Sequence, residues 1–157
     1  MKILIFTEGT ILMHSTGKNV KRTERIRQVE SQIEDIHNYA DYIPIGNAVE
    51  KITKWTENGY TIYYLTSRRT TLEVDQIQNV LTKNNFPKGE LLYRSTSEEY
   101  KDVAERLLPY ILIEGDCESI GGIPEMTYPN MSDTAKGIVK SISVKEFGGI
   151  GSLPDKS

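Results

Sequence analysis

The chain opens with Met1-Lys2-Ile3-Leu4-Ile5-Phe6-Thr7-Glu8-Gly9-Thr10, an apolar run followed by a polar turn. The run from Ile3 to Phe6 is short and continuous, and it ends before Gly9. Such a run is typical of a strand that is buried on both faces of a parallel sheet. We therefore predict a strand at residues 3–6, with the polar residues 7–10 at its carboxyl end.

Strands and helices alternate outward from this first strand. Further strands are predicted at 60–65, 90–93 and 110–113, and amphipathic helices at 26–39, 48–55, 72–81 and 100–107. Residue pairs with capping-box spacing precede the last three helices: Asn47 with Glu50, Thr70 with Glu73, and Thr96 with Glu99. This alternation indicates an α/β fold with a mostly parallel sheet that is covered by helices on both faces.

The pattern is weaker in two other parts of the chain. Residues 11–21 have no clear period and are predicted to form a loop or a small hairpin flap. After Gly121, residues 126–128 would add a short strand and residues 135–142 a helix. Residues 143–157 are predicted to form a loosely structured C-terminal tail.

Composition limits the classes of protein to which the chain can belong. Its 157 residues, 38% of them hydrophobic, fit a single domain, 1–157, with a sizeable core. The net charge of −3, with both signs interspersed, argues against a dedicated nucleic-acid binder. Cys117 is the only cysteine, which suits a reducing compartment. The apolar run at the start is too short for a signal sequence or a membrane span, so we expect a cytoplasmic protein without a membrane partner.

Polar side chains gather where the predicted strands end. Open parallel sheets bind ligands at the carboxyl ends of their strands. The first strand leads into residues 6–10, the second into Thr66-Ser67-Arg68, and the fourth into Glu114-Gly115-Asp116-Cys117-Glu118. These segments supply carboxylates, hydroxyls and glycine backbone, so we place the candidate site at this edge of the sheet.

In order and spacing, these segments resemble the four motifs of the haloacid dehalogenase superfamily over residues 1 to 122. Phe6-Thr7-Glu8-Gly9-Thr10 corresponds to the Asp-x-Asp-Gly-Thr loop, and Thr66-Ser67 to the second motif. Lys101 is the candidate for the third motif, although it could equally be a solvated helix lysine, and Glu114-Gly115-Asp116 corresponds to the fourth. The resemblance implies a three-layer α/β/α, Rossmann-like fold with at most a minimal cap, and residues 11–45 as a flap or small cap insertion.

The resemblance also implies a role for each motif. Glu8 would be the general acid and base, and Lys101 would offset charge on the phosphoryl group. Phosphate oxygens would be held by Thr7, Gly9, Thr10, Thr66, Ser67 and Arg68. Asp116 and Glu114 would be the ligands of Mg²⁺, which prefers oxygen donors. The ligand would be a small phosphorylated molecule.

The first motif departs from the family pattern at its most important position. Phe6 stands where the family has its nucleophilic aspartate, and a phenyl ring can neither attack phosphorus nor bind a cation as an oxygen ligand does. Glu8 keeps the carboxylate of the second aspartate but is one methylene longer. We therefore expect weakened Mg²⁺ binding and impaired catalysis.

Three hypotheses about function follow from this departure. The first is a catalytically impaired domain that still binds a phosphorylated ligand. The second is an active Mg²⁺-dependent phosphatase in which another group replaces the nucleophile. The third is a structural or oligomerisation module, such as a homodimer, that uses the helix predicted at 26–39.

Overall fold

The computed structural model describes residues 1–15, 22–30 and 41–155. Within them a five-stranded sheet has the order β5-β4-β1-β6-β7, and neighbouring strands are parallel throughout. The strands are β5 (Glu90–Leu92), β4 (Thr61–Leu65), β1 (Lys2–Phe6), β6 (Ile111–Gly115) and β7 (Lys140–Val144). The predicted α/β class and mostly parallel sheet are confirmed.

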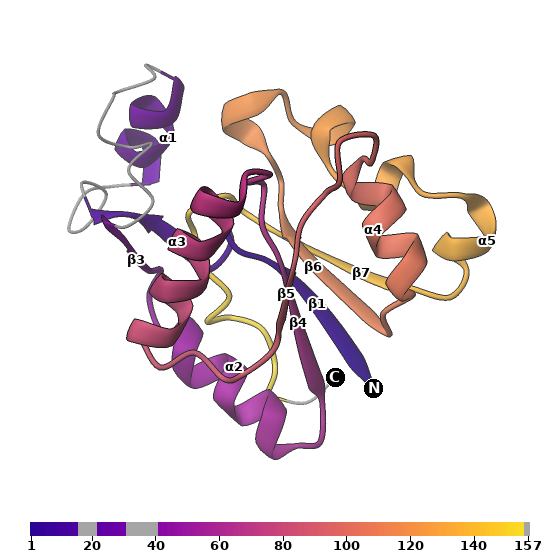
Figure 1. The fold of residues 1–157 in the computed structure, drawn as a ribbon, viewed down its shortest axis with the longest axis horizontal. Helices are drawn as coiled ribbons and strands as arrows, with labels where there is room; N and C mark the ends of the chain where they lie inside the picture. The colour runs from indigo at the N-terminus through magenta and orange to yellow at the C-terminus, as the bar shows by residue number, and fades with distance from the viewer. Residues whose placement is uncertain (16–21, 31–40, 156–157) are drawn as a thin grey trace.

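Helices cover both faces of this sheet and make three layers (Figure 1). The helices α2 (Ala48–Glu57) and α3 (Thr71–Lys83) lie on one face, and α4 (Tyr100–Leu107) and α5 (Asp133–Lys136) lie on the other. Side chains alternate between the two faces along β1, because successive residues of a strand point to opposite sides. Ile3 and Ile5 belong to the cluster under α2 and α3, and Leu4 belongs to the cluster under α4 and α5.

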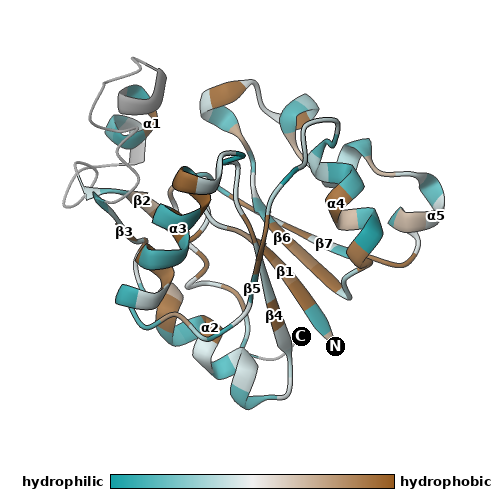
Figure 2. Cartoon of the chain, viewed as in Figure 1, coloured by the Kyte–Doolittle hydropathy of each residue, from teal (hydrophilic) through white to brown (hydrophobic). Residues whose placement is uncertain are grey.

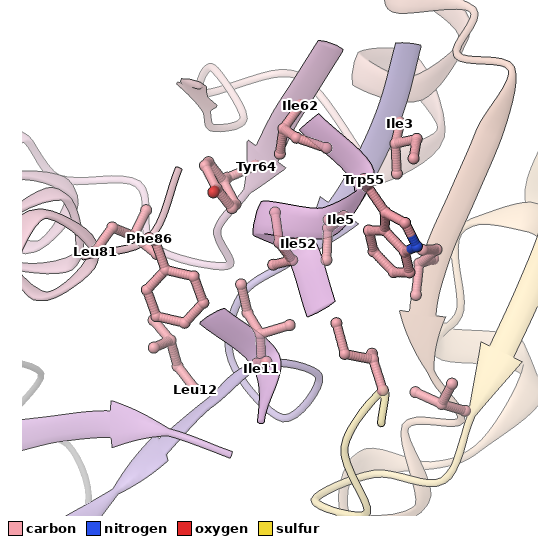
Figure 3. Packing of buried hydrophobic residues seen from close by; sticks show 14 of the residues in the cluster. Ile3, Ile5, Ile11, Leu12, Ile52, Trp55, Ile62, Tyr64, Leu81 and Phe86 are labelled. Carbon is pink, nitrogen blue, oxygen red and sulfur yellow. The ribbon is translucent and has the colours of Figure 1, made fainter. Parts of the chain in front are cut away.

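The inner strands are apolar along most of their length, as their colour in Figure 2 shows. Ile52 and Trp55 of α2 point toward Ile3, Ile5 and Ile62 of the sheet (Figure 3). Burial of this apolar area is the main stabilising term, at about 25 cal/mol per Å². It holds the carboxyl ends of β1, β4 and β6 at fixed positions, and the candidate site is built on them.

Two predictions for the second half of the chain are wrong. The helix predicted at 135–142 is replaced by the short helix α5 and the edge strand β7, which pairs with β6. The strand predicted at 126–128 is replaced by the 3-10 turns η5 (Ile123–Glu125) and η6 (Tyr128–Asn130). Pro124 and Pro129 lie at the starts of these turns, and a proline has no N–H to donate to a strand neighbour.

The helix caps agree with the sequence at one of the three predicted positions. Thr70 caps α3, and its hydroxyl accepts from the Glu73 N–H. Asn47 precedes α2 but makes no side-chain cap bond. The capping box of α4 is formed by Glu99 and Asp102, one turn later than predicted.

Residues 11–45 include a small second sheet. Strand β2 (Leu12–His14) pairs antiparallel with β3 (Tyr42–Pro44). Between them lies α1 (Arg22–Glu30), which includes residues 26–30 of the helix predicted at 26–39 and extends farther toward the N-terminus. Residues 31–39 lie outside the described residues. That residues 11–45 act as a flap or small cap stays a prediction.

The C-terminal segment differs from the predicted loose tail. Its first two residues belong to β7, and Ile150 is fully buried. The Lys51 ammonium donates to the Leu153 carbonyl at 2.6 Å, and the Trp55 indole donates to the Pro154 carbonyl at 2.9 Å. The described part of this segment is therefore packed against α2. Among the described residues, no helix is long and apolar enough to span a bilayer.

Candidate functional site

A cavity of about 250 Å³ lies at the carboxyl ends of the central strands. Phe6, Glu8 and Thr10 line it from the end of β1, and Ser67 and Arg68 line it from the end of β4. Cavities at this edge of a parallel sheet are the usual ligand sites of such folds. The structure thus brings the first two predicted motifs together.

The Glu8 carboxylate binds to the second motif. The Ser67 N–H donates to Glu8 Oε1 at 2.6 Å, and the Ser67 hydroxyl donates to the same oxygen at 2.5 Å. The Thr66 hydroxyl lies 2.8 Å from Glu8 Oε2, and the Thr7 hydroxyl also donates to this oxygen. We call the Thr66 hydroxyl, the Ser67 hydroxyl and the Ser67 N–H the anion cradle. In the structure this cradle holds a carboxylate of the protein itself.

The backbone of the first motif is engaged within the protein. The Thr7 N–H donates to Leu65 at 3.0 Å, and the Gly9 N–H donates to Leu12 at 2.8 Å. The Thr10 N–H donates to Thr7 at 3.3 Å, while the Thr10 hydroxyl accepts from the Gly115 N–H at 3.0 Å. These amides were expected to hold phosphate, but they instead fix the turn between β1 and β2.

Phe6 occupies the end of β1 beside an aromatic partner. Its ring contacts the Tyr100 ring edge-on, with centroids 4.8 Å apart. The Arg94 guanidinium stacks on the same Tyr100 ring at 3.9 Å and donates to the Ser67 carbonyl at 3.0 Å. Burial lowers the pKa of Arg94 from its ordinary value. Phe6, Tyr100 and Arg94 thus form a stack that ends at the anion cradle.

Lys101 lies outside this cavity. It lines a separate hollow with Arg94 and Glu99, whereas its neighbour Tyr100 lines the cavity itself. Tyr100 lines both hollows, whereas Lys101 lines only the second. Arg94, which contacts the Ser67 carbonyl beside the cradle, was not among the residues predicted from the sequence. Arg94 follows β5, so it could have been predicted because parallel sheets bind ligands at the carboxyl ends of their strands.

The carboxylates of the fourth motif also accept hydrogen bonds from backbone N–H groups of the protein. Glu114 is buried, and its two oxygens accept from the Thr127 N–H at 2.7 Å and the Tyr128 N–H at 3.0 Å. Burial raises the pKa of Glu114. Asp116 Oδ1 accepts from the N–H groups of Glu118 and Glu146, each at 3.2 Å.

A second buried carboxylate in the cavity wall, that of Glu146, follows the unpredicted strand β7. Glu146 accepts from the Ser119 N–H at 3.0 Å and from the Ser119 hydroxyl at 2.9 Å. Burial raises its pKa, and burial also raises the pKa of the nearby Cys117 thiol to about 12. The thiol is therefore protonated at neutral pH and is a poor nucleophile.

These contacts do not fit a magnesium ion. Glu114 uses both oxygens for backbone amides, Asp116 uses one in a turn, and Phe6 has no oxygen to offer. Within residues 1–15, 22–30 and 41–155, no group of three or more His, Cys, Asp and Glu side chains is placed to hold a metal. We therefore assign no chemical step to a metal in this chain.

Solved structures of other proteins share the fold of this chain. Two structures of the class C acid phosphatase from Bacillus anthracis, one with tungstate bound, match with TM-scores of 0.60 and 0.61. They are 15% and 13% identical, and the matches cover 94% and 98% of this chain and 68% and 74% of theirs. A chain of the Pnkp1/Rnl/Hen1 RNA repair complex matches at 0.55 with 11% identity, over 92% of this chain and 43% of its own. The chain has the haloacid-dehalogenase-like fold of these phosphatases.

The family can be stated more narrowly. A family model described as "PITM 1-3, LNS2 domain" matches residues 24–112, which is more than half of the chain, and the chain belongs to this family. A comparison with curated proteins gives no match.

Proposed function

We propose that this chain is a haloacid-dehalogenase-like domain that binds a small phosphorylated molecule without hydrolysing it. The observation that carries the proposal is the position of Phe6. Its ring stands at the end of β1, where the family places the attacking carboxylate, and it packs against Tyr100 at the cavity wall.

The other groups near Phe6 do not replace the missing nucleophile. Thr7 is fully buried, and its hydroxyl donates to the Glu8 carboxylate and lies 3.3 Å from the Leu65 carbonyl oxygen. Cys117 lines the cavity with its pKa raised by burial. A covalent phosphoryl intermediate needs an activated nucleophile that the ligand can reach. Thr7 is buried and does not line the cavity, and the Cys117 thiol stays protonated.

Anion-binding chemistry is better supported. The cradle presents a backbone N–H and two hydroxyls to one point, and two guanidinium groups flank it. The Arg68 Nε donates to the Ser67 hydroxyl at 3.0 Å, and Arg94 donates to the Ser67 carbonyl. Converging N–H and O–H donors with nearby arginines are the usual groups that bind phosphoryl oxygens. The tungstate in the related acid phosphatase is a tetrahedral oxyanion of the same kind.

The cavity beside the cradle can hold the rest of such a ligand. Its volume of about 250 Å³ and its aromatic lining, which includes Phe6, Tyr42 and Tyr100, suit a small organic group. The ligand would thus place its phosphoryl group at the strand ends and an apolar or aromatic group in the cavity.

Binding and turnover should be measured together with p-nitrophenyl phosphate and Mg²⁺. We expect calorimetry to detect binding that is weakened in Thr66→Val, with no release of nitrophenol above that of a blank. Nitrophenol release that disappears in Glu8→Gln or Asp116→Asn would contradict the proposal and favour an active phosphatase.

A further inference from the structure

We propose that Glu8 is a built-in occupant of the anion cradle, so that its carboxylate and the phosphoryl group of a ligand bind there in alternation. This inference rests on the proposed function and specifies how the same site is regulated. The observation that supports it is that Thr66 and Ser67 both donate to one carboxylate, that of Glu8.

The contacts of Glu8 are those that an external anion would make. Oε1 accepts from the Ser67 N–H at 2.6 Å and from the Ser67 hydroxyl at 2.5 Å, and it lies 3.0 Å from the Thr66 hydroxyl oxygen. Oε2 accepts from the Thr66 hydroxyl at 2.8 Å and from the Thr7 hydroxyl. Each donor of the cradle is therefore directed at Glu8, and a second anion would find the donors already in use.

Side-chain length explains how a residue of the first motif reaches the second. Glu8 follows β1 and Ser67 follows β4, which are neighbouring parallel strands with Phe6 opposite Leu65. A glutamate extends one methylene farther than the aspartate of the family pattern. That extra methylene lets the carboxylate span the gap between the two strand ends.

The charges around the cradle can hold one anion but disfavour two. Arg68 contacts the Ser67 hydroxyl, and Arg94 contacts the Ser67 carbonyl from the other side. Arg68 also lies 3.7 Å from a carboxylate oxygen of Glu73, so with Glu8 present two carboxylates balance the two guanidinium groups. A phosphate beside an ionised carboxylate would lose its hydrogen bonds and meet a like charge at close range. The ligand must therefore displace Glu8 into the cavity, which the Glu8 side chain already lines.

The test is calorimetric titration of inorganic phosphate into the full chain. The proteins are wild type, Glu8→Ala, and Glu8→Gln, which removes the charge while keeping the side chain's size in case the alanine variant folds poorly. Glu125→Ala is the matched control, because Glu125 is an exposed carboxylate that lines the same cavity from η5. Thr66→Val in the Glu8→Ala background shows whether any gained binding is in the cradle.

We expect phosphate to bind Glu8→Ala about tenfold or more tightly than wild type, since each hydrogen bond to a charged group is worth at least this factor. Glu8→Gln should gain affinity in the same direction, Glu125→Ala should change it by less than about threefold, and Thr66→Val should remove the gain. Equal affinity in wild type and both Glu8 variants would overturn the inference. An equal gain of phosphate affinity in Glu125→Ala would overturn the inference too, because the removal of any negative charge from the cavity would then explain the gain.

Failure of this inference can be told apart from failure of the proposed function. If wild type binds p-nitrophenyl phosphate without turnover and the Glu8 variants gain no phosphate affinity, only the inference fails. If the Glu8 variants gain affinity while wild type hydrolyses the ester, the proposed function fails and the occupancy of the cradle by Glu8 stands.

Discussion

The Glu8 carboxylate lies 2.6 Å from the backbone nitrogen of Ser67, a residue 59 positions away in the sequence. This contact joins the first two of the four motifs on which the resemblance to the haloacid dehalogenase superfamily rests. It also means that the glutamate is held by the groups that were expected to hold a ligand. The site therefore differs from the family pattern in two ways: Phe6 stands at the position of the nucleophile, and the Glu8 carboxylate binds the second motif.

Replacing Arg94 should weaken both the fold and the cradle. Arg94→Lys keeps the charge but loses the planar stack on Tyr100 and the fixed bond to the Ser67 carbonyl. We expect a loss of about 1 to 2 kcal/mol in urea unfolding and weaker phosphate binding in the Glu8→Ala background. Lys101→Met is the control, and its effect on both measurements should be small. A larger effect from Lys101 than from Arg94 would reverse our assignment of the cation at the cradle.

The aromatic contact of Phe6 should contribute measurable stability. Phe6→Leu retains much of the apolar volume but removes the edge-on contact with Tyr100. Aromatic pairs contribute about 0.5 to 1.5 kcal/mol beyond the area they bury, and we expect a destabilisation in this range from chemical denaturation. A double-mutant cycle with Tyr100→Leu should give a coupling energy of similar size. A coupling energy near zero would show that the two rings are independent.

Glu146 should make stability fall as the pH rises. Its folded-state pKa is raised by burial above the ordinary value of 4.5, so the folded protein binds this proton more tightly than the unfolded chain does. The stabilising contribution is complete below pH 4.5 and is lost as the pH rises through the folded-state pKa. Glu146→Gln can keep both bonds to Ser119 but does not titrate. As the pH rises through the folded-state pKa of Glu146, the free energy of unfolding should therefore fall in wild type relative to the glutamine variant. If the two proteins show the same dependence of this free energy on pH, the raised pKa of Glu146 is contradicted.

The packed C-terminal segment gives a prediction about stability alone. Ile150 is fully buried, so Ile150→Ala should cost about 2 to 4 kcal/mol in the free energy of unfolding. Ile138 is 56% exposed, and Ile138→Ala should change stability by less than about 1 kcal/mol. Similar losses at the two positions would indicate that residue 150 is not part of the core.

The fold was predictable from the sequence where apolar residues are continuous. Ile3 to Phe6 and Ile111 to Ile113 belong to central strands, and burial on both faces gives such strands an unmistakable pattern. The edge strand β7 was not recognised, because Ala135, Ile138, Val139 and Ile142 recur at helix-like steps of three and four residues and overlap its short polar-apolar alternation. Pairing with β6 decides its conformation, and that contact is not visible in local sequence.

The candidate site was predictable to the same extent as the strands that carry it. Thr66, Ser67 and Glu8 follow recognised strands, and the structure brings them together. Glu146 was missed because the strand before it was missed. Local spacing also could not show that the carboxylate of Glu8 reaches Ser67, or that Glu114 is bound by the backbone near residue 127.

The amide proton resonance of Ser67 tests most directly whether Glu8 occupies the place of the ligand's anion. A short bond to a carboxylate is charge-assisted and moves an amide proton far downfield. We predict a strongly downfield Ser67 resonance in wild type, an upfield shift in Glu8→Ala, and a return downfield when inorganic phosphate is added to that variant. A Ser67 resonance that is unchanged by Glu8→Ala, or that does not respond to phosphate in the variant, would contradict the account.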